Sequence, residues 1–360
     1  MEKLIKPKKL QEGDTIALIT LSGTGASNFP KRYEIGKKQI QDSLKLKIID
    51  TPNAIKPKDF IYNNPKERLN DLMWAFQNKE VKAIIAITGG DDSIRLLDFV
   101  KEEYLEIIRR NPKIFVGLSD ITTINFLCLK AGIVSFYGPS VLFGLAENGG
   151  IDEYTIKYLE KALFESNPIG EIKNNSKGWT LDRVPWENSS IKRKMQKPIE
   201  MNFLKGEEIS EGRLIGGCMD VLEFMKGTSL WPCKEVWKDS ILFIETSEEK
   251  PTPSQIKYWL RNYAAQGILR NLKGIIFGIP GGDIPFDDPE YNSKLKEHLD
   301  SFEKYDEIFL KVCKEYNLTL PIVTHVQFGH IAPMLTLPIG VMARIDCKNK
   351  KIEIIESGVQ

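Results

Sequence analysis

The sequence predicts an α/β protein with two domains, a Rossmann- or flavodoxin-like N-terminal domain built on a parallel sheet and a smaller, β-rich mixed α/β C-terminal domain. Over the first 140 or so residues, short apolar runs alternate with amphipathic segments, which is typical of βα units around a parallel sheet. The chain has 360 residues, and a chain of this length usually folds around more than a single hydrophobic core, so we expect two domains. Its apolar fraction of 42% is enough for a sizeable core.

The N-terminal elements follow from where the apolar periodicity changes. Runs of four to eight apolar residues bounded by turn residues predict strands, and longer runs with helical spacing predict helices. We expect strands at 15–21, 46–50, 81–88, 114–117 and 133–137, with helices at 33–44, 65–78, 93–110 and 121–131.

The domain organisation is predicted from a change of composition in the middle of the chain. We place the N-terminal domain at 1–165, a linker or lid at 166–199 and the C-terminal domain at 200–360. The middle segment is polar and rich in turn residues, yet it carries Trp179 and Trp186, which need a surface to cover. In the C-terminal domain we expect strands at RLIGG, SILFIE, KGIIFGI and LPIVTHV, helices at PSQIKYWLRNYAAQ and 288–316, and a hairpin at 343–356.

The charge balance excludes several classes of partner. Lys and Arg number 50 against 49 Asp and Glu, so no overall field favours nucleic acid or an anionic membrane. The lysine-rich N-terminus is not followed by an apolar run, and no stretch is long enough to span a bilayer. We therefore expect a cytoplasmic protein that acts on a small molecule.

The cysteines indicate neither a disulfide framework nor a metal site. Their spacing contains no C-x-x-C pair and no histidine at ligand spacing, which argues against zinc. We expect reduced thiols and no metal at Cys128, Cys218, Cys233, Cys313 and Cys347.

The stretch VKAIIAITGGDDSIRLLDFV suggests a nucleophile. It leads from a buried strand through a Gly-Gly turn into a helical segment that begins at Ser93, and a serine at such a turn is exposed as in a nucleophile elbow. We predict Ser93 as the nucleophile, with the backbone N–H groups of Gly90 and Ile94 as oxyanion donors. The alternative is that Ser93 only caps the helix and the glycines only make the turn.

The chain offers three histidines as a general base for this serine. His298 lies among charged residues and is expected in solvent, whereas His325 lies in the apolar run IVTHV and fits a core position. His330 follows a strand in the glycine-flanked loop QFGHIAPM, where catalytic residues often lie, so we predict it as the base.

A carboxylate that orients the histidine is predicted at Glu245. It ends the apolar run SILFIE, where a charge needs a partner, while Glu248 and Glu249 follow in the turn and are expected to face solvent. The order along the chain, Ser, Glu, His, is one of several that unrelated triads use.

Two other features bear on ligands. TIALITLSGTGAS resembles a dinucleotide loop, but Asn28 replaces the third glycine of the pattern, so we expect no cofactor. For Trp179 and Trp186 we consider two roles, stacking on a substrate or packing of the lid.

Six stretches together resemble a known family, the LD-carboxypeptidases, and within it the branch of the microcin C self-immunity proteins. They are ITGGDDSIRLL, GLSDITTIN, YGPSV, GRLIGGCMDVLEFMKGT, ILFIETSEE and FGHIAPMLTLPIG, and they cover nearly the whole chain. The resemblance implies Ser93, Glu245 and His330 as the triad of a serine hydrolase, two domains, and a homodimer.

The resemblance also implies two possible substrates. Members of the self-immunity branch cleave the amide that joins an aminoacyl group to a nucleotide analogue, using an aromatic loop to stack on the base, and the Trp179/Trp186 segment favours this activity. The alternative is the removal of the terminal D-alanine from a muropeptide. A third hypothesis, of another class, is a small-molecule binding protein without catalysis.

Two positions depart from the pattern of the family. The usual Gly-Gly-Asn appears here as Gly216-Gly217-Cys218, and the lysine that some members place four residues after the catalytic glutamate is Glu249. In the family these positions help to hold an acidic side chain of the substrate. Cys218 and Glu249 are therefore candidate substrate-binding residues, and a preference for acidic adducts is not implied.

Overall fold

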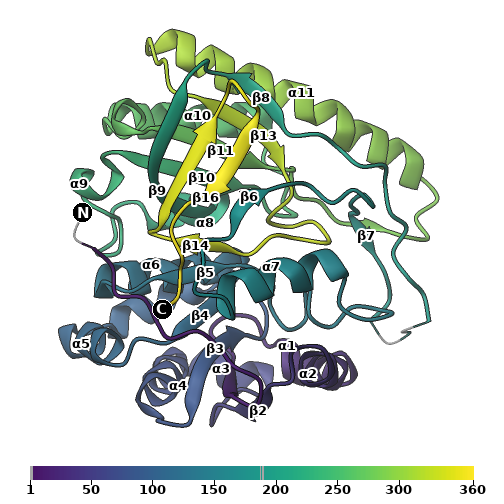
Figure 1. The fold of residues 1–360 in the computed structure, drawn as a ribbon. Helices are drawn as coiled ribbons and strands as arrows, with labels where there is room; N and C mark the ends of the chain where they lie inside the picture. The colour runs from purple at the N-terminus through teal and green to yellow at the C-terminus, as the bar shows by residue number, and fades with distance from the viewer. Residues whose placement is uncertain (1–2, 187, 189) are drawn as a thin grey trace.

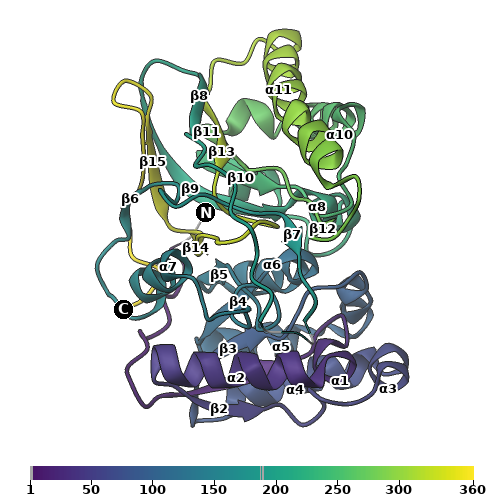
Figure 2. The same ribbon diagram turned by 90° about the vertical axis from the view of Figure 1, so that its right-hand side faces the viewer.

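The computed structural model describes residues 3–186, 188 and 190–360 and contains two large sheets, one above the other in both views (Figures 1 and 2). The first sheet has the order β14-β5-β4-β3-β1-β2. All its neighbours are parallel except β14, which runs antiparallel to β5. Its strands are β1 (Thr15–Ile19), β2 (Lys47–Asp50), β3 (Val81–Ala86), β4 (Ile114–Gly117), β5 (Ser135–Tyr137) and β14 (Leu337–Ile339).

Helices cover both faces of the first sheet. Consecutive residues of its central strands point to opposite sides, and both sets are apolar, so each face needs a covering layer. Ala17, Ile84 and Phe115 belong to one apolar cluster, with side chains of α4, α5 and α6. Their neighbours Ile16 and Ile85 face the other cluster, which includes side chains of α2 and α7 and continues into the second sheet. The helices are α1 (Gly25–Asn28), α2 (Pro30–Leu44), α3 (Lys58–Asn63), α4 (Pro65–Gln77), α5 (Glu102–Arg110), α6 (Thr122–Ala131) and α7 (Glu153–Leu163).

The second sheet has the order β6-β16-β15-β9-β10-β11-β13-β8. Its centre, β9 to β13, is parallel, and antiparallel strands flank it on both sides. The strands are β6 (Gly170–Ile172), β8 (Asn202–Lys205), β9 (Ile209–Cys218), β10 (Ser240–Glu245), β11 (Gly274–Gly278), β13 (Ile322–Val326), β15 (Met342–Asp346) and β16 (Lys351–Ile354). The helices of this half are α8 (Met219–Met225), α9 (Lys234–Trp237), α10 (Pro253–Ala265) and α11 (Tyr291–Glu315), and the short strands β7 (Asp182–Arg183) and β12 (Ile284–Pro285) pair with each other.

Most expected elements are confirmed, including the hairpin of β15 and β16. Two expectations are wrong. The segment 93–110 is not one helix but a 3₁₀ helix, η1 (Ser93–Phe99), followed by α5. His298 is buried rather than solvated, with its Nε2 3.0 Å from the carbonyl oxygen of Pro280.

The middle segment packs more closely onto the body of the protein than its polar composition suggests. Its strand β6 pairs with β16, and Thr180 exchanges two backbone hydrogen bonds with Ala332. Trp179 is only 2% exposed and lies 5.9 Å, centroid to centroid, from Phe302 of α11. The surface that covers this tryptophan comes from an element more than 100 residues away in the sequence.

The end of the chain returns to the first half of the protein. After β13 of the second sheet, the chain enters the first sheet as β14 and then returns to the second as β15. The last residue is tied to the N-terminal segment, since Gln360 accepts a hydrogen bond from Lys9 and donates one to Pro7. Among the described helices, none is both long and apolar enough to cross a membrane.

The burial of Trp179 yields a stability prediction. Trp179→Ala should lower the free energy of unfolding by about 3–5 kcal/mol, because it removes a large side chain from a packed apolar cluster. Urea unfolding measures the effect, with Tyr258→Ala as the control, since Tyr258 is a large aromatic residue exposed on α10. Equal stability losses in the two variants would contradict the described packing.

Candidate active site

A cavity of about 400 Å³ lies where the loops after several strands of the first sheet meet loops of the second half. Ligands of parallel α/β sheets bind at this edge, outside the carboxyl ends of the strands. The lining includes Gly90 after β3, Ser119 after β4, Trp186 from the middle segment, and Glu248 and His330 from loops of the second half.

Glu245 and His330 form a closely coupled pair in the wall of this cavity. Glu245 ends β10 and is fully buried, and its Oε2 lies 2.8 Å from His330 Nδ1. The backbone N–H of His330 donates to the same oxygen at 3.1 Å. The pairing that the sequence predicted between these two residues is thus present, and it fixes which imidazole nitrogen faces the carboxylate.

The electrostatics of the pair favour two charges. Burial opposes ionisation of Glu245, but the attraction of His330 and hydrogen bonds from His330 and Tyr137 outweigh it, so the pKa of Glu245 is lowered. Burial also lowers the pKa of His330, but attraction by Glu245, a hydrogen bond with it, and the charges of Glu248 and Asp220 together raise that pKa to about 9. His330 can therefore hold a proton strongly while it is paired.

Gly329 allows the close approach of these two residues. Its φ is +93°, and a Cβ built there would lie 2.4 Å from Glu245 Oε2. The residue before the histidine therefore has to be glycine for both conformation and space.

Ser93 does not lie in the cavity, which corrects the prediction that it is exposed at a strand-to-helix turn. It has no exposed surface, and its Oγ donates to the backbone carbonyl of Asp120 at 2.8 Å. Its N–H donates to Asp120 Oδ2 at 2.7 Å, and the N-cap position of η1 is Asp92 rather than Ser93. Ser93 holds Asp120 in place and is not accessible to a substrate.

Ser119, the residue before Asp120, occupies the position that the sequence analysis assigned to Ser93. Only Leu118 separates it from the end of β4, and the 3₁₀ turn η2 (Ser119–Ile121) that it begins leads into α6. Its φ is +63°, a left-handed conformation that costs a non-glycine residue about 1–3 kcal/mol. A sharp, strained strand-to-helix turn that presents a serine to a cavity is the geometry of a nucleophile elbow.

The first of the two glycines before Ser93, Gly89, lies against Ser119. A Cβ at Gly89 would lie 2.8 Å from Ser119 Cβ, so the two backbones approach closely. Gly90 lines the cavity, as predicted for an oxyanion donor, and within the described part of the chain its N–H has no recorded partner. Ile94 instead packs against the core and does not line the cavity.

Tyr137, at the end of β5, connects the serine turn to the glutamate. Its hydroxyl donates to Glu245 Oε1 and accepts a hydrogen bond of 3.2 Å from the N–H of Ser119. It is almost fully buried, and burial raises its pKa well above the ordinary value for tyrosine. The sequence analysis assigned Tyr137 no role, although a polar group at the end of a buried parallel strand is a signal for one.

Trp186 lines the cavity, whereas Trp179 lies in the apolar cluster described above and does not. The ring of Trp186 meets Phe29 edge to face at 4.7 Å, and the Arg32 guanidinium lies 5.2 Å from its centroid. The structure therefore gives the packing role to Trp179 and leaves Trp186 as the candidate for stacking.

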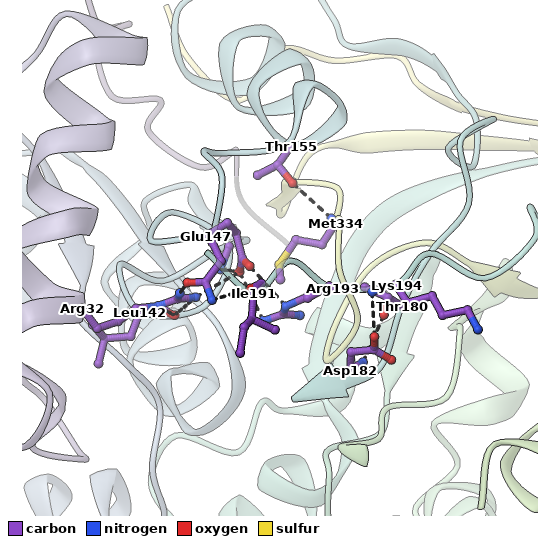
Figure 3. Close-up of polar contacts among 12 residues, drawn as sticks. Arg32, Leu142, Glu147, Thr155, Thr180, Asp182, Ile191, Arg193, Lys194 and Met334 are labelled. Carbon is purple, nitrogen blue, oxygen red and sulfur yellow. Dashed lines mark hydrogen bonds and ion pairs between the residues drawn. The ribbon is translucent and has the colours of Figure 1, made fainter. Parts of the chain in front are cut away.

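An ion pair and a backbone hydrogen bond hold residues 193 and 194, which lie a few residues after Trp186. Figure 3 shows Arg193 reaching towards Glu147, which also faces Arg32, and Lys194 beside Asp182. Arg193 Nε lies 3.2 Å from Glu147 Oε2, and the backbone N–H of Lys194 donates to Asp182 Oδ2 at 2.7 Å. These contacts fix the cavity wall that carries Trp186.

Cys218 and Glu249 lie outside the cavity lining. Cys218 is buried beside Glu245, and its sulfur, a Glu245 oxygen and a His330 nitrogen lie within 4.8 Å of one another. These three side chains are the group in the described chain that could hold a metal ion, and metal independence stays a prediction. Glu249 is exposed, and the neighbouring Glu248 is the residue that reaches the cavity.

Comparison with known proteins identifies the family. Residues 16–138 match the N-terminal domain of the LD-carboxypeptidases, and residues 211–345 match their C-terminal domain. The chain belongs to the LD-carboxypeptidase family. It is accordingly a serine-type hydrolase, and the non-catalytic alternative loses its support.

Individual members of the family resemble the chain over nearly its full length. The microcin C7 self-immunity protein MccF of Escherichia coli is 26% identical over 96% of this chain and 94% of its own. A crystal structure of an MccF-like protein from Streptococcus pneumoniae in complex with AMP superposes with a TM-score of 0.81, at 28% identity over 95% of this chain and 98% of that one. MccF in complex with glutamyl sulfamoyl guanosine superposes with a TM-score of 0.78, at 25% identity over 99% of both chains.

The His330–Glu245 pair gives a pH prediction for this LD-carboxypeptidase-family chain. NMR of ring-labelled histidine should show one imidazole titrating at about 9, assigned to His330 by its loss in His330→Gln, and another, His298, at about 4 because of its burial. The pKa of His330 is raised above its unfolded value of about 6.5. The contribution of His330 to stability is therefore fully present below about pH 6.5 and is lost as pH rises through about 9.

Glu245→Gln provides the control for this titration. It keeps the shape of the side chain but removes the charge that raises the pKa of His330, so the high titration should move down. A His330 signal that titrates near 6.5 in the unmodified protein would show that the pair is not ionised as described.

Proposed function

We propose that this chain is a serine amidase in which Ser119 is the nucleophile, His330 the general base and Glu245 the residue that orients the histidine. The observation that carries this proposal is the strained turn at Ser119, which opens into the cavity that His330 also lines. Glu245 and His330 keep the roles that the sequence analysis gave them, and Ser119 replaces Ser93.

The chemistry follows from the position of each group. His330 Nε2 takes the proton of Ser119 as Ser119 Oγ bonds to the carbonyl carbon of the substrate, and Glu245 stabilises the imidazolium that forms. The oxyanion is held by the N–H of Gly90 and by that of Asp120, the residue after the nucleophile. His330 then protonates the leaving nitrogen. In the second half of the reaction it takes a proton from water as the water bonds to the acyl carbon, and it returns that proton to Ser119 Oγ as the bond from Oγ to the acyl carbon breaks.

We propose an aminoacyl group joined to a nucleotide as the substrate. The aromatic pair of Phe29 and Trp186 in the cavity wall offers a flat surface for a base. The complexes of related proteins with AMP and with glutamyl sulfamoyl guanosine support a ligand of this class. The second candidate is a muropeptide that loses its terminal D-alanine, which the family name favours.

A substrate panel separates the two candidates. The purified protein is incubated in parallel with a muropeptide tetrapeptide and with a series of aminoacyl-sulfamoyl adenosines, and the products are identified by mass. Cleavage of the adenosine adducts alone supports our proposal, and cleavage of the tetrapeptide alone supports the second candidate. The homodimer and the cytoplasmic location stay predictions.

The nucleophile assignment predicts the effect of three alanine variants. Ser119→Ala and His330→Ala should each lower kcat on the order of a million-fold, as in the subtilisin triad, and the double variant should be scarcely worse because the residues act as a unit. Ser93→Ala is the matched control. It should lose far less activity than Ser119→Ala, since Ser93 does not reach the cavity and its N–H can still bond to Asp120 Oδ2.

Kinetics and thermal unfolding of each variant check this prediction. A Ser93→Ala variant that folds stably but is inactive, together with an active Ser119→Ala variant, would restore the original assignment.

The stacking role of Trp186 predicts an effect that depends on the substrate. Trp186→Ala should lower kcat/KM for an adenosine adduct about ten- to a hundred-fold, by analogy with base stacking worth about 1–3 kcal/mol in single-strand binders. Trp186→Phe keeps an aromatic ring and should lose less. A peptide substrate without a base should be cleaved as before, so a uniform loss on both substrates would contradict stacking.

A further inference from the structure

Glu248 is the charged residue in the cavity that meets the catalytic base directly. Its Oε2 lies 3.3 Å from His330 Nε2, the nitrogen that has to receive the proton of Ser119. The side chain is 53% exposed and lines the cavity from the turn after β10. Glu248 therefore contacts the same imidazole nitrogen, His330 Nε2, that Ser119 has to contact when it gives up its proton.

The other charges of the cavity wall have partners of their own. Arg183 pairs with Asp283 at 3.0 Å, and Arg193 pairs with Glu147. Asp182 accepts hydrogen bonds from the N–H of Lys194 and the hydroxyl of Tyr291. Among the described residues, Glu248 has no lysine or arginine at ion-pair distance, and His330 is its one recorded cationic partner.

This arrangement is unfavourable for catalysis by the protein alone. When His330 is neutral, as a general base must be, Glu248 loses its counter-charge. Negative charge then develops on the carbonyl oxygen nearby, and two like charges in a partly desolvated site repel each other. A cation brought by the substrate would remove this repulsion.

We propose that Glu248 determines specificity by binding the free α-ammonium group of an aminoacyl substrate. That ammonium is two bonds from the scissile carbonyl carbon, close to the atoms that His330 serves. By pairing with Glu248 it would draw the carboxylate away from His330 Nε2 and free that nitrogen for Ser119. A muropeptide has no such cation, because the α-nitrogen next to its scissile bond is an uncharged amide.

The proposal rests on the proposed amidase activity, and a pair of substrates tests it separately. Norleucyl-sulfamoyl adenosine and hexanoyl-sulfamoyl adenosine differ only in the α-amine, which is largely protonated at pH 7. For the unmodified protein we expect kcat/KM to be at least about tenfold higher for the norleucyl adduct, as a charge-assisted contact gives. In Glu248→Gln the two values should come within about threefold, mainly because the norleucyl adduct is cleaved more slowly.

Glu249→Gln is the matched control, since Glu249 is an adjacent acid that is exposed and outside the cavity. It should keep the preference of the unmodified protein. Binding of both adducts to Ser119→Ala, measured by calorimetry, gives the same comparison without turnover: the norleucyl adduct should bind at least about tenfold more tightly, and Glu248→Gln should remove the difference.

Two results would overturn the proposal while leaving the amidase intact. Equal kcat/KM for both adducts in the unmodified protein would show that the amine is not recognised. Equal slowing of both adducts in Glu248→Gln would show that Glu248 acts on His330 and not on the substrate. If neither adduct is hydrolysed, the proposed function fails. In that case the binding measurement still tests Glu248: equal binding of the two adducts to Ser119→Ala would overturn its role as well.

Discussion

The site depends on a fully buried carboxylate that stays ionised. Glu245 is placed at the end of β10, where burial alone would favour its neutral form. Hydrogen bonds from the backbone and ring of His330 and from the hydroxyl of Tyr137 outweigh that penalty. Tyr137 also accepts from the N–H of Ser119, so one carboxylate connects the serine turn of the first half to the histidine loop of the second.

Much of this arrangement could be predicted from the sequence because it follows from local patterns. The alternation of strands and helices predicted the parallel sheet. The contact between Glu245 and His330 was predicted because a charge at the end of a buried strand needs a partner and a histidine in a glycine-flanked loop can supply one. Ser93, which is buried rather than exposed, shows the limit of such patterns. Ser93 follows a glycine turn and lies seven residues beyond the end of β3, whereas Ser119 is two residues beyond β4.

The sequence does contain a signal for Ser119, since Gly117-Leu118-Ser119 leads directly from a buried strand into the short turn that begins the next helical segment. The sequence cannot show which residues are covered by elements that lie far away along the chain. Trp179 is covered by α11, and the cavity position of Glu248 rather than Glu249 depends on how one turn folds over His330. Both outcomes are set by contacts between segments far apart in the chain.

The path of the chain around His330 has a mechanical consequence. His330 lies on the connection that leaves the second sheet at β13 and enters the first sheet at β14, so its ends are held by two different sheets. A sliding or hinge movement of one sheet against the other would therefore displace this connection. The position of His330 thus depends on the alignment of the two sheets, and a distant change at their interface would change the geometry of the His330–Glu245 pair.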